Sequence, residues 1–161
     1  PTGADSIAWF REFIGETWKK LNRPCSQPVI SQAFAYLDAR EKAMEPSAFV
    51  MLHGDAHGNN TLQDLSQKNA YKLIDPDGIF YEKAYDLGVL MREWPEEYAQ
   101  DPFRKGWERC AYLHALTGVP AQAIWEWGFL QTVSTAFVLL QIGQEEQGRA
   151  MLHVAESWRT A

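Results

Sequence analysis

Hydrophobic positions recur with a helical period over most of the chain. Near the start, apolar residues return every three or four positions over residues 7–21, and the turn residues Asn22-Arg23-Pro24 follow them. This spacing predicts an amphipathic helix, with Asp5 or Ser6 as its N-terminal cap. A second helix is expected over residues 28–46, because a proline ends the same kind of pattern.

The helical period returns in the second half of the chain. We expect four further helices, over residues 84–94, 102–116, 121–142 and from beyond Gly143 to Trp158. Proline or glycine residues separate these segments and indicate where each helix ends. Trp125 and Trp127 lie two positions apart, so one is expected to face the core and the other the surface or a neighbouring lobe.

The pattern changes between these two helical regions. Phe49–Leu52 and Tyr71–Ile74 are short apolar runs, the first followed by a glycine and the second by Pro76 and Gly78. Short apolar runs bounded by turn residues predict buried strands that end in loops. The whole chain, residues 1–161, is therefore expected to form one mainly α (α+β) domain, whose helices surround a small strand pair.

Composition and charge narrow the class of protein. Hydrophobic residues make up 46% and aromatic residues 13% of the 161 positions, which predicts a globular fold with a sizeable core. The formal net charge of -6 argues against the basic surface that nucleic-acid binding requires. A negative surface favours a cationic small molecule as the partner.

Cysteine usage and the length of apolar runs bear on where the protein works. Cys25 and Cys110 lie far apart and show no metal-ligand spacing, so two reduced thiols are expected. No apolar run approaches ~18 residues, and the start of the chain lacks a signal-peptide pattern. These features predict a soluble cytoplasmic protein with no membrane contact.

Two acidic side chains and one amide mark the loops that follow the expected strands. Asp55 and Asn60 lie five positions apart in the first loop, and Asp75 begins the second. Mg²⁺ prefers hard oxygen ligands and keeps several waters, so Asn60 and Asp75 suffice to hold it beside the phosphates of a nucleotide. Asp55 is placed to accept a hydrogen bond from a substrate hydroxyl and then its proton. Because loops at strand ends commonly carry reactive side chains, we expect the three to converge as a magnesium-dependent phosphoryl-transfer site.

The stretch His53-Gly54-Asp55-Ala56-His57-Gly58-Asn59-Asn60 resembles the catalytic loop of protein kinases, in which an Asn follows the catalytic Asp by five positions. It is more similar to the loop of aminoglycoside phosphotransferases, H-G-D-x-H-x-x-N. The continuation from Ile74 to Trp94 looks like the streptomycin phosphotransferase branch, often grouped as aminoglycoside/hydroxyurea resistance kinases. The specific resemblance covers His53 to Trp94, and the flanking helices are compatible with it.

The resemblance implies an activity, a cofactor and a set of roles. It implies a phosphotransferase that moves the γ-phosphate of ATP to a hydroxyl of an aminoglycoside-like acceptor, with Mg²⁺ as cofactor, as in streptomycin-type antibiotic resistance. Carried over by position, it implies Asp55 as the catalytic base and Asn60 and Asp75 as the Mg²⁺ ligands. Asp86 is implied as a buried brace of the catalytic loop, and its place near a helix start suits a carboxylate.

Five further residues complete the expected site. His53 and His57 are expected to hold the loop by hydrogen bonds rather than to act as catalysts. Asp77, Glu82 and Glu93 are candidates for contact with a second metal or with a cationic, sugar-like substrate.

The nucleotide-binding part of a kinase is missing from the pattern. A kinase needs a β-rich lobe with a glycine-rich loop over the phosphates and a lysine that contacts them. Nothing before Phe49 offers G-x-G-x-x-G or a lysine in a β-rich run. We therefore expect the C-terminal lobe of a protein-kinase-like fold, with the N-terminal lobe absent from this chain. Alone it is expected to be inactive and to bind nucleotide weakly, and its exposed apolar docking face is expected to promote self-association.

Two other interpretations fit parts of the sequence. Gly54-Asp55-Ala56-His57-Gly58 also fits the G-D-x-H-G of metallophosphoesterases, but the downstream G-D and G-N-H boxes that complete a two-metal site are missing. A non-catalytic kinase-like binding module is the other interpretation, and the missing lobe keeps it open. A phosphoesterase should hydrolyse a generic phosphomonoester with Mn²⁺ and no nucleotide, whereas a kinase lobe should not.

Overall fold

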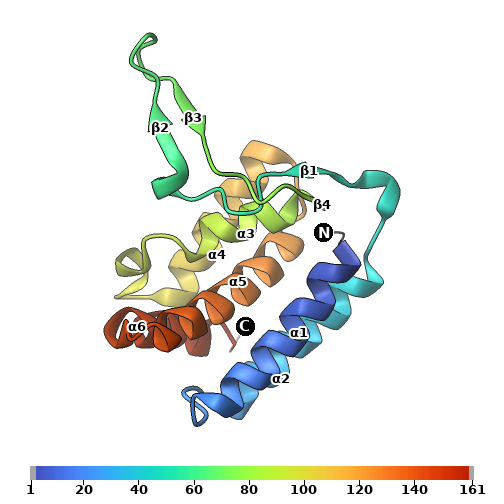
Figure 1. The fold of residues 1–161 in the computed structure, drawn as a ribbon, viewed down its shortest axis with the longest axis vertical. Coiled ribbons are helices and arrows are strands. Elements are labelled where there is room, and N and C mark those ends of the chain that lie inside the picture. Colours follow the sequence, from blue (N-terminus) through green and yellow to red (C-terminus); the bar gives the residue numbers. More distant parts are fainter. Residues whose placement is uncertain (1–2, 160–161) are drawn as a thin grey trace.

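The computed structural model describes residues 3–159 and consists mainly of helices, with four short strands (Figure 1). The helices are α1 (Gly3–Lys20), α2 (Gln27–Lys42), α3 (Ala84–Arg92), α4 (Pro102–Thr117), α5 (Ala121–Gln141) and α6 (Glu145–Trp158). The strands are β1 (Val50–Leu52), β2 (Thr61–Gln63), β3 (Tyr71–Leu73) and β4 (Ile79–Tyr81). Three short 3-10 helices are η1 (Pro46–Ala48), η2 (Gly58–Asn60) and η3 (Pro95–Tyr98). This content confirms the expected class, mainly α (α+β).

α5 is the central helix, and it packs against α1, α2, α3, α4 and α6 (Figure 1). Most of its side chains are buried, on all sides of the helix, which is typical of the centre of a core. By length and composition α5 could cross a membrane, but 83% of its most apolar window is buried inside the protein. Trp125 and Trp127 are both buried, so the expectation that one of them faces the surface is wrong.

α3 crosses α5 at a close contact made by two glycines. A Cβ placed on Gly88 of α3 would lie 2.7 Å from the Cβ of Trp127, and one placed on Gly128 of α5 would lie 2.6 Å from the Cβ of Met91. Packed carbon atoms do not approach that closely, so the missing side chains are what allows the two helices to meet. The crossing fixes α3 against the core, and α3 carries two residues of the site described below.

The four strands form two separate antiparallel pairs. β1 pairs with β4, with Met51 opposite Phe80, and β2 pairs with β3, with Leu62 opposite Lys72. The two strands predicted from the sequence, β1 and β3, each pair with a strand that the sequence did not predict. β3 is exposed at all three positions, so the prediction of a buried strand is wrong there. The β2–β3 hairpin projects from the helical body (Figure 1).

The predicted helices are all present. Their buried faces follow the apolar period, as at Ile7 and Ile14 of α1. α1 begins before Asp5 and Ser6, so the prediction that one of them caps this helix is wrong. α2 ends at Lys42, several residues before the proline that the sequence suggested as its stop.

Large apolar side chains remain exposed on the strands. Met51 and Phe80, opposite each other on β1 and β4, share a face and are 71% and 46% exposed, and we name this pair the apolar strand surface. Leu62, on the β2–β3 hairpin, lies on the other face of that hairpin from Tyr71 and Leu73. Exposed apolar residues gathered on neighbouring elements are typical of surfaces that contact a partner.

Candidate functional site

The loop between β1 and β2, residues 53–60, is tied to α3 by a carboxylate. Asp86 accepts hydrogen bonds from the backbone N–H groups of His53 at 2.9 Å and Gly54 at 2.8 Å. Gly54 has a φ of +90°, and a Cβ there would lie 2.7 Å from the Cβ of Asp77. Glycine alone tolerates that conformation and that contact together. Asp86 therefore fixes the point where the loop leaves β1, which is the bracing position that the sequence implied.

His53 links this loop to the loop that follows β3. Its Nε2 donates to the carbonyl oxygen of Ile74 at 2.8 Å, and its Nδ1 accepts from the backbone N–H of Asp55 at 3.3 Å. These contacts place the ring hydrogen on Nε2. The carbonyl oxygen of His53 also accepts from the N–H groups of Asp77 and Gly78. Every one of these contacts holds backbone, as expected of a structural histidine.

A backbone hydrogen bond joins the two loops directly. The N–H of Ile74 donates to the carbonyl oxygen of Asn60 at 2.9 Å, so both backbone polar groups of the residue before Asp75 are bonded to the first loop. Asp75 is exposed and has a φ of +58°, in the left-handed region that Asp tolerates better than most residues. Its carboxylate makes no hydrogen bond or ion pair with any residue that the structure describes. The two loops are therefore held together while Asp75 stays open to solvent.

Three side chains hold the carboxylate of Asp55. Its Oδ1 accepts from Nη2 of Arg92 at 2.5 Å. Its Oδ2 accepts from Nδ2 of Asn60 at 3.3 Å, and Nε2 of His57 lies 3.1 Å from the same oxygen. Nδ2 of Asn60 also donates to the carbonyl oxygen of Asp55 at 3.0 Å. The structure therefore brings Asp55 and Asn60 together and uses the nitrogen side of the Asn60 amide within the loop.

His57 opens the short helix η2. Its Nδ1 accepts from the backbone N–H of Asn59 at 3.1 Å, which leaves the ring hydrogen on Nε2, facing Asp55. His57 thus holds the loop from inside, in agreement with the expected loop-bracing role, and it also lines the cavity described next.

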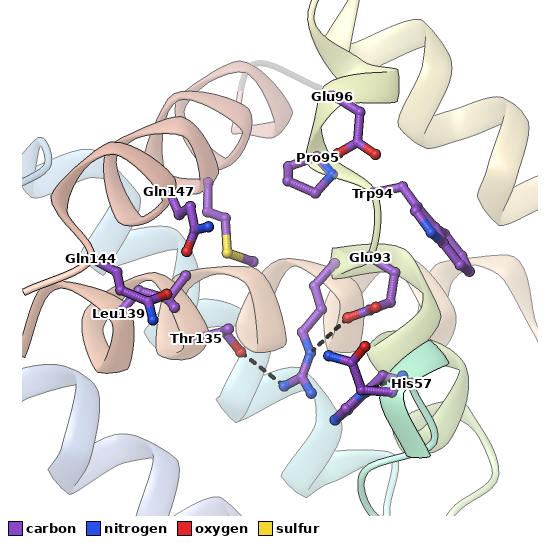
Figure 2. Close-up of a pocket in the computed structure, with 12 residues that line it drawn as sticks. His57, Glu93, Trp94, Pro95, Glu96, Thr135, Leu139, Gln144 and Gln147 are labelled. Carbon is purple, nitrogen blue, oxygen red and sulfur yellow. Dashed lines mark hydrogen bonds and ion pairs between the residues drawn. The ribbon is translucent and has the colours of Figure 1, made fainter. Parts of the chain in front are cut away.

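A cavity of about 630 Å³ opens beside this cluster (Figure 2). Figure 2 shows Trp94 and Glu96 on one side of it and Gln144 and Gln147 on the other, with His57 and Glu93 toward the loop. The volume is that of a small-molecule site. The two glutamates give the cavity an acidic side, which suits a cationic ligand.

Trp94, which lines this cavity, has a left-handed backbone conformation. Its φ is +51°, directly before Pro95, and its side chain is 47% exposed. A positive φ is a genuine outlier for a bulky residue, and strained backbone is often retained at functional sites. The strain is a second, independent reason to regard the cavity as functional.

Arg92 connects Asp55 to the core helix. Its Nη1 donates to Oε1 of Gln131 at 3.1 Å and to Oγ1 of Thr135 at 2.8 Å, both on α5. Its Nε lies 3.9 Å from a carboxylate oxygen of Glu93. The sequence did not mark Arg92, Gln131 or Thr135 as site residues. The available signal was that Gln131 and Thr135 lie four positions apart on α5 and so share one face of a mostly apolar helix.

The three candidates for substrate or second-metal contact lie in different places. Glu93 lines the large cavity. Asp77 instead borders a smaller cavity of about 420 Å³ with the aromatic residues Trp9, Phe10 and Tyr85. The structure does not bring Asp77 to the large cavity beside Asp55.

Glu82 belongs to the interior. Its Oε1 accepts from Nε1 of Trp127 at 2.7 Å, and its Oε2 accepts from Arg40 at 3.4 Å. Arg40 also forms an ion pair with the buried Glu126. Burial raises the pKa of Glu82, while Trp127 and Arg40 oppose that shift. With both oxygens engaged by packing partners, Glu82 is not retained as a substrate or second-metal candidate.

Neither a metal-binding cluster in the described part of the chain nor a known relative points to the function. Among the described residues, no group of three or more His, Cys, Asp or Glu side chains is arranged to hold a metal ion. Comparison of the chain with protein-family models, with curated proteins and with solved structures finds no match. Function is therefore inferred from the residues and their geometry.

Proposed function

We propose that this chain is the catalytic, substrate-binding lobe of a protein-kinase-like phosphotransferase, which moves the γ-phosphate of ATP to a hydroxyl of a cationic, aminoglycoside-like molecule. The observation that carries the proposal is the joined pair of loops, with Asp55 and Asn60 in contact in one loop and Asp75 at the head of the other. Phosphoryl transfer depends mainly on positioning and electrostatic stabilisation, and joined loops supply the positioning.

Asp55 is the group that would receive the acceptor hydroxyl. Its side chain is 34% exposed, and although Asp55 does not line the neighbouring cavity, its partners His57 and Arg92 do. In the proposed reaction it accepts a hydrogen bond from the hydroxyl and orients the oxygen. It takes the proton as the new oxygen–phosphorus bond forms and the bond from the γ-phosphorus to the β–γ bridging oxygen breaks, so that ADP leaves. His57, Asn60 and Arg92 keep the carboxylate in place during this step.

The donor set at the two loops fits a magnesium ion. The amide oxygen of Asn60 has no partner among the described residues, because the nitrogen side makes the contacts to Asp55. The exposed carboxylate of Asp75 lies at the head of the adjoining loop. One amide oxygen and one carboxylate, completed by waters and phosphate oxygens, are typical of Mg²⁺ sites. When bound, the ion would neutralise charge on the transferring phosphate.

The acidic side of the large cavity supports a cationic acceptor. Glu93 and Glu96 face a space large enough for a sugar-sized molecule, and the chain carries a formal net charge of -6. Trp94 adds an aromatic surface against which a sugar ring or an ammonium group can pack. Glu93→Gln is expected to raise KM for a polycationic acceptor about tenfold with kcat little changed, because one charge-assisted contact is lost in ground and transition state alike. Glu12→Gln, on the exposed side of α1, is the control and should leave both constants unchanged.

A second lobe is part of the proposal. Residues 3–159 contain no β-rich lobe that could cover a nucleotide, and the apolar strand surface is exposed. We infer that this surface meets the N-terminal lobe, and that without it the surface promotes self-association. The 161-residue chain is then expected to sediment with a concentration-dependent mass, and Met51→Ser together with Phe80→Ser should reduce that dependence.

The proposal is tested by a radiolabelled phosphate-transfer screen with the full-length gene product, over aminoglycosides and uncharged polyols. Asp55→Ala is expected to lose several orders of magnitude in turnover. Asp64→Ala is the matched control, since among the described residues the Asp64 carboxylate contacts only Ser66 and Lys72, both within the projecting hairpin. Absence of transfer to every acceptor, or an Asp55→Ala protein as active as the wild type, refutes the proposal.

Two further assays separate the alternatives. Hydrolysis of a generic phosphomonoester with Mn²⁺ and no nucleotide would indicate a metallophosphoesterase instead. Binding of a cationic acceptor without any transfer would indicate a kinase-like binding module. Each outcome differs from that expected of a kinase lobe, which transfers phosphate only from a nucleotide.

A further inference from the structure

We infer that Arg92 is the positioning residue of Asp55: anchored on the core helix α5, it fixes the carboxylate so that an acceptor position on Oδ1 remains open. The inference rests on the proposed function for its catalytic meaning, but the contacts that carry it are independent of any substrate. They run from α5, through the guanidinium of Arg92, to the loop between β1 and β2.

The guanidinium is held on its core side before it reaches Asp55. Nη1 of Arg92 donates to Gln131 and to Thr135, which lie one helical turn apart on the same face of α5. Gln131 is 3% exposed, and the Arg92 side chain is 14% exposed. Because a guanidinium is rigid and planar, fixing Nη1 also fixes the direction in which Nη2 points. Nη2 points at Oδ1 of Asp55, at 2.5 Å.

The contact with Arg92 determines which hydrogen-bond acceptor positions of the Asp55 carboxylate stay free. An ionised carboxylate offers about four lone-pair positions, two on each oxygen. Asn60 uses one position on Oδ2, with Nε2 of His57 3.1 Å from that oxygen, and Arg92 uses one position on Oδ1. The second position on Oδ1, beside the Arg92 contact, stays open, and a substrate hydroxyl can donate there. Without Arg92 both positions on Oδ1 would be free, and the carboxylate could turn about its soft terminal torsion.

The charge of Arg92 also affects where in the cavity the cationic part of a substrate binds and where its hydroxyl binds. Arg92 lies against Asp55 and has its Nε 3.9 Å from Glu93, so it offsets part of the negative charge nearest the loop. Glu96 lines the same cavity and makes no ion pair with any described residue, so a cationic substrate is drawn there rather than to Asp55. Asp55 is left to bind a hydroxyl, which is the group that must react.

The kinetic test uses Arg92 variants of the full-length protein. Arg92→Leu is expected to lower kcat about 100-fold with KM within about threefold of wild type, since displacing a reacting group by about 1 Å costs that much. Arg92→Lys keeps the charge but offers a single nitrogen, so it should recover only part of kcat, to about tenfold below wild type. Thermal unfolding of each variant measures any loss of fold separately.

α5 offers a matched pair of controls. Thr135→Val removes the hydroxyl that accepts from Arg92, and it is expected to lower kcat about fivefold because the guanidinium is then held by one acceptor. Thr132→Val makes the same chemical change one turn earlier, at a buried hydroxyl that has no hydrogen-bond partner within residues 3–159. Thr132→Val should keep kcat within about twofold of wild type.

A spectroscopic test needs no reaction and uses the 161-residue chain. The side-chain amide of Asn60 donates to Asp55, so its ¹H–¹⁵N resonances report the orientation of that carboxylate. These resonances are expected to shift in Arg92→Leu and Thr135→Val, and to stay in place in Thr132→Val. Unshifted resonances in Arg92→Leu, or a kcat within threefold of wild type, overturn the inference. A wild-type protein that transfers no phosphate overturns the proposed function instead, and the Asn60 resonances then still decide whether Arg92 orients Asp55.

Discussion

Because α3 and α5 cross closely at Gly88, we expect Gly88→Ala to lower the unfolding free energy. The new Cβ would lie 2.7 Å from the Cβ of Trp127, 2.8 Å from its carbonyl carbon and 3.1 Å from the nitrogen of Gly128. Two of these three atoms are backbone, so no side-chain rotation relieves the contact. The helices must instead separate by about 0.7 Å to restore an ordinary van der Waals distance.

The expected cost follows from two opposing terms. Overpacking a well-packed core costs about 1–3 kcal/mol, and contact with buried backbone places this site at the upper end. Replacing a helical glycine by alanine contributes about 1 kcal/mol in the other direction. The net loss of unfolding free energy is therefore about 2 kcal/mol, which lowers Tm by about 4–8 °C for a domain of this size.

Urea unfolding followed by tryptophan fluorescence measures the change in unfolding free energy of Gly88→Ala, because Trp125 and Trp127 are buried on α5 and report its unfolding. Gly15→Ala is the matched control, since Gly15 also lies within a helix but its new Cβ would meet only Phe34, at 3.4 Å. That variant should gain about 0.5–1 kcal/mol through helix propensity. If Gly88→Ala unfolds within 0.5 kcal/mol of wild type, the glycine crossing does not hold α3 as described.

Three further predictions concern single residues. Asp86→Ala leaves two backbone N–H groups without their carboxylate acceptor, so it should cost about 3–5 kcal/mol in unfolding free energy, read from the urea midpoint. Burial raises the folded pKa of Glu82 above its ordinary value of 4.5, so the folded state binds the proton more tightly. Stability from this group is present below pH 4.5 and is lost as pH rises through the folded pKa, and Glu82→Gln should remove that part of the pH dependence of unfolding. Burial raises the pKa of the Cys25 thiol to about 12 and that of Cys110 to about 11, so native protein at pH 8 should react with iodoacetamide far more slowly than protein in urea. Equal rates in both conditions would contradict the burial of these thiols.

The helices could be predicted from the sequence because their apolar period is local and strong. Each predicted helix is present, and turn residues such as Gly118 lie at the predicted ends. The strand pairing could not be predicted in the same way. All four strands are only three residues long, so their alternation is too short to indicate which strands pair, and β1 pairs with β4 across the 26 intervening residues 53–78. The exposure of β3 depends on what packs over it, which no local pattern records.

The site residues that are close together in the sequence could be predicted, and those brought together only by the fold could not. Asp55 and Asn60 could be selected because they lie five positions apart in one loop, and the structure joins them. Arg92 lies 37 positions from Asp55, and its anchors on α5 lie a further 39 and 43 positions on, so its role depends on how two helices cross. Glu82 shows the opposite error, because a residue within the recognised stretch turns inward to Trp127 instead of toward the cavity.

Two side chains that hold the first loop, Asp86 and Arg92, lie on a single nine-residue helix, α3. A rigid-body displacement of α3 therefore carries His53 to Asp55 as one unit, and Ile74 follows through its two bonds to that loop. The tip of the β2–β3 hairpin has its hydrogen bonds within the hairpin itself, from Asp64 to Lys72. Motion at the tip is thus mechanically decoupled from Asp55, which makes residues 65–69 the place where an inserted peptide or a fluorophore disturbs the chemistry least.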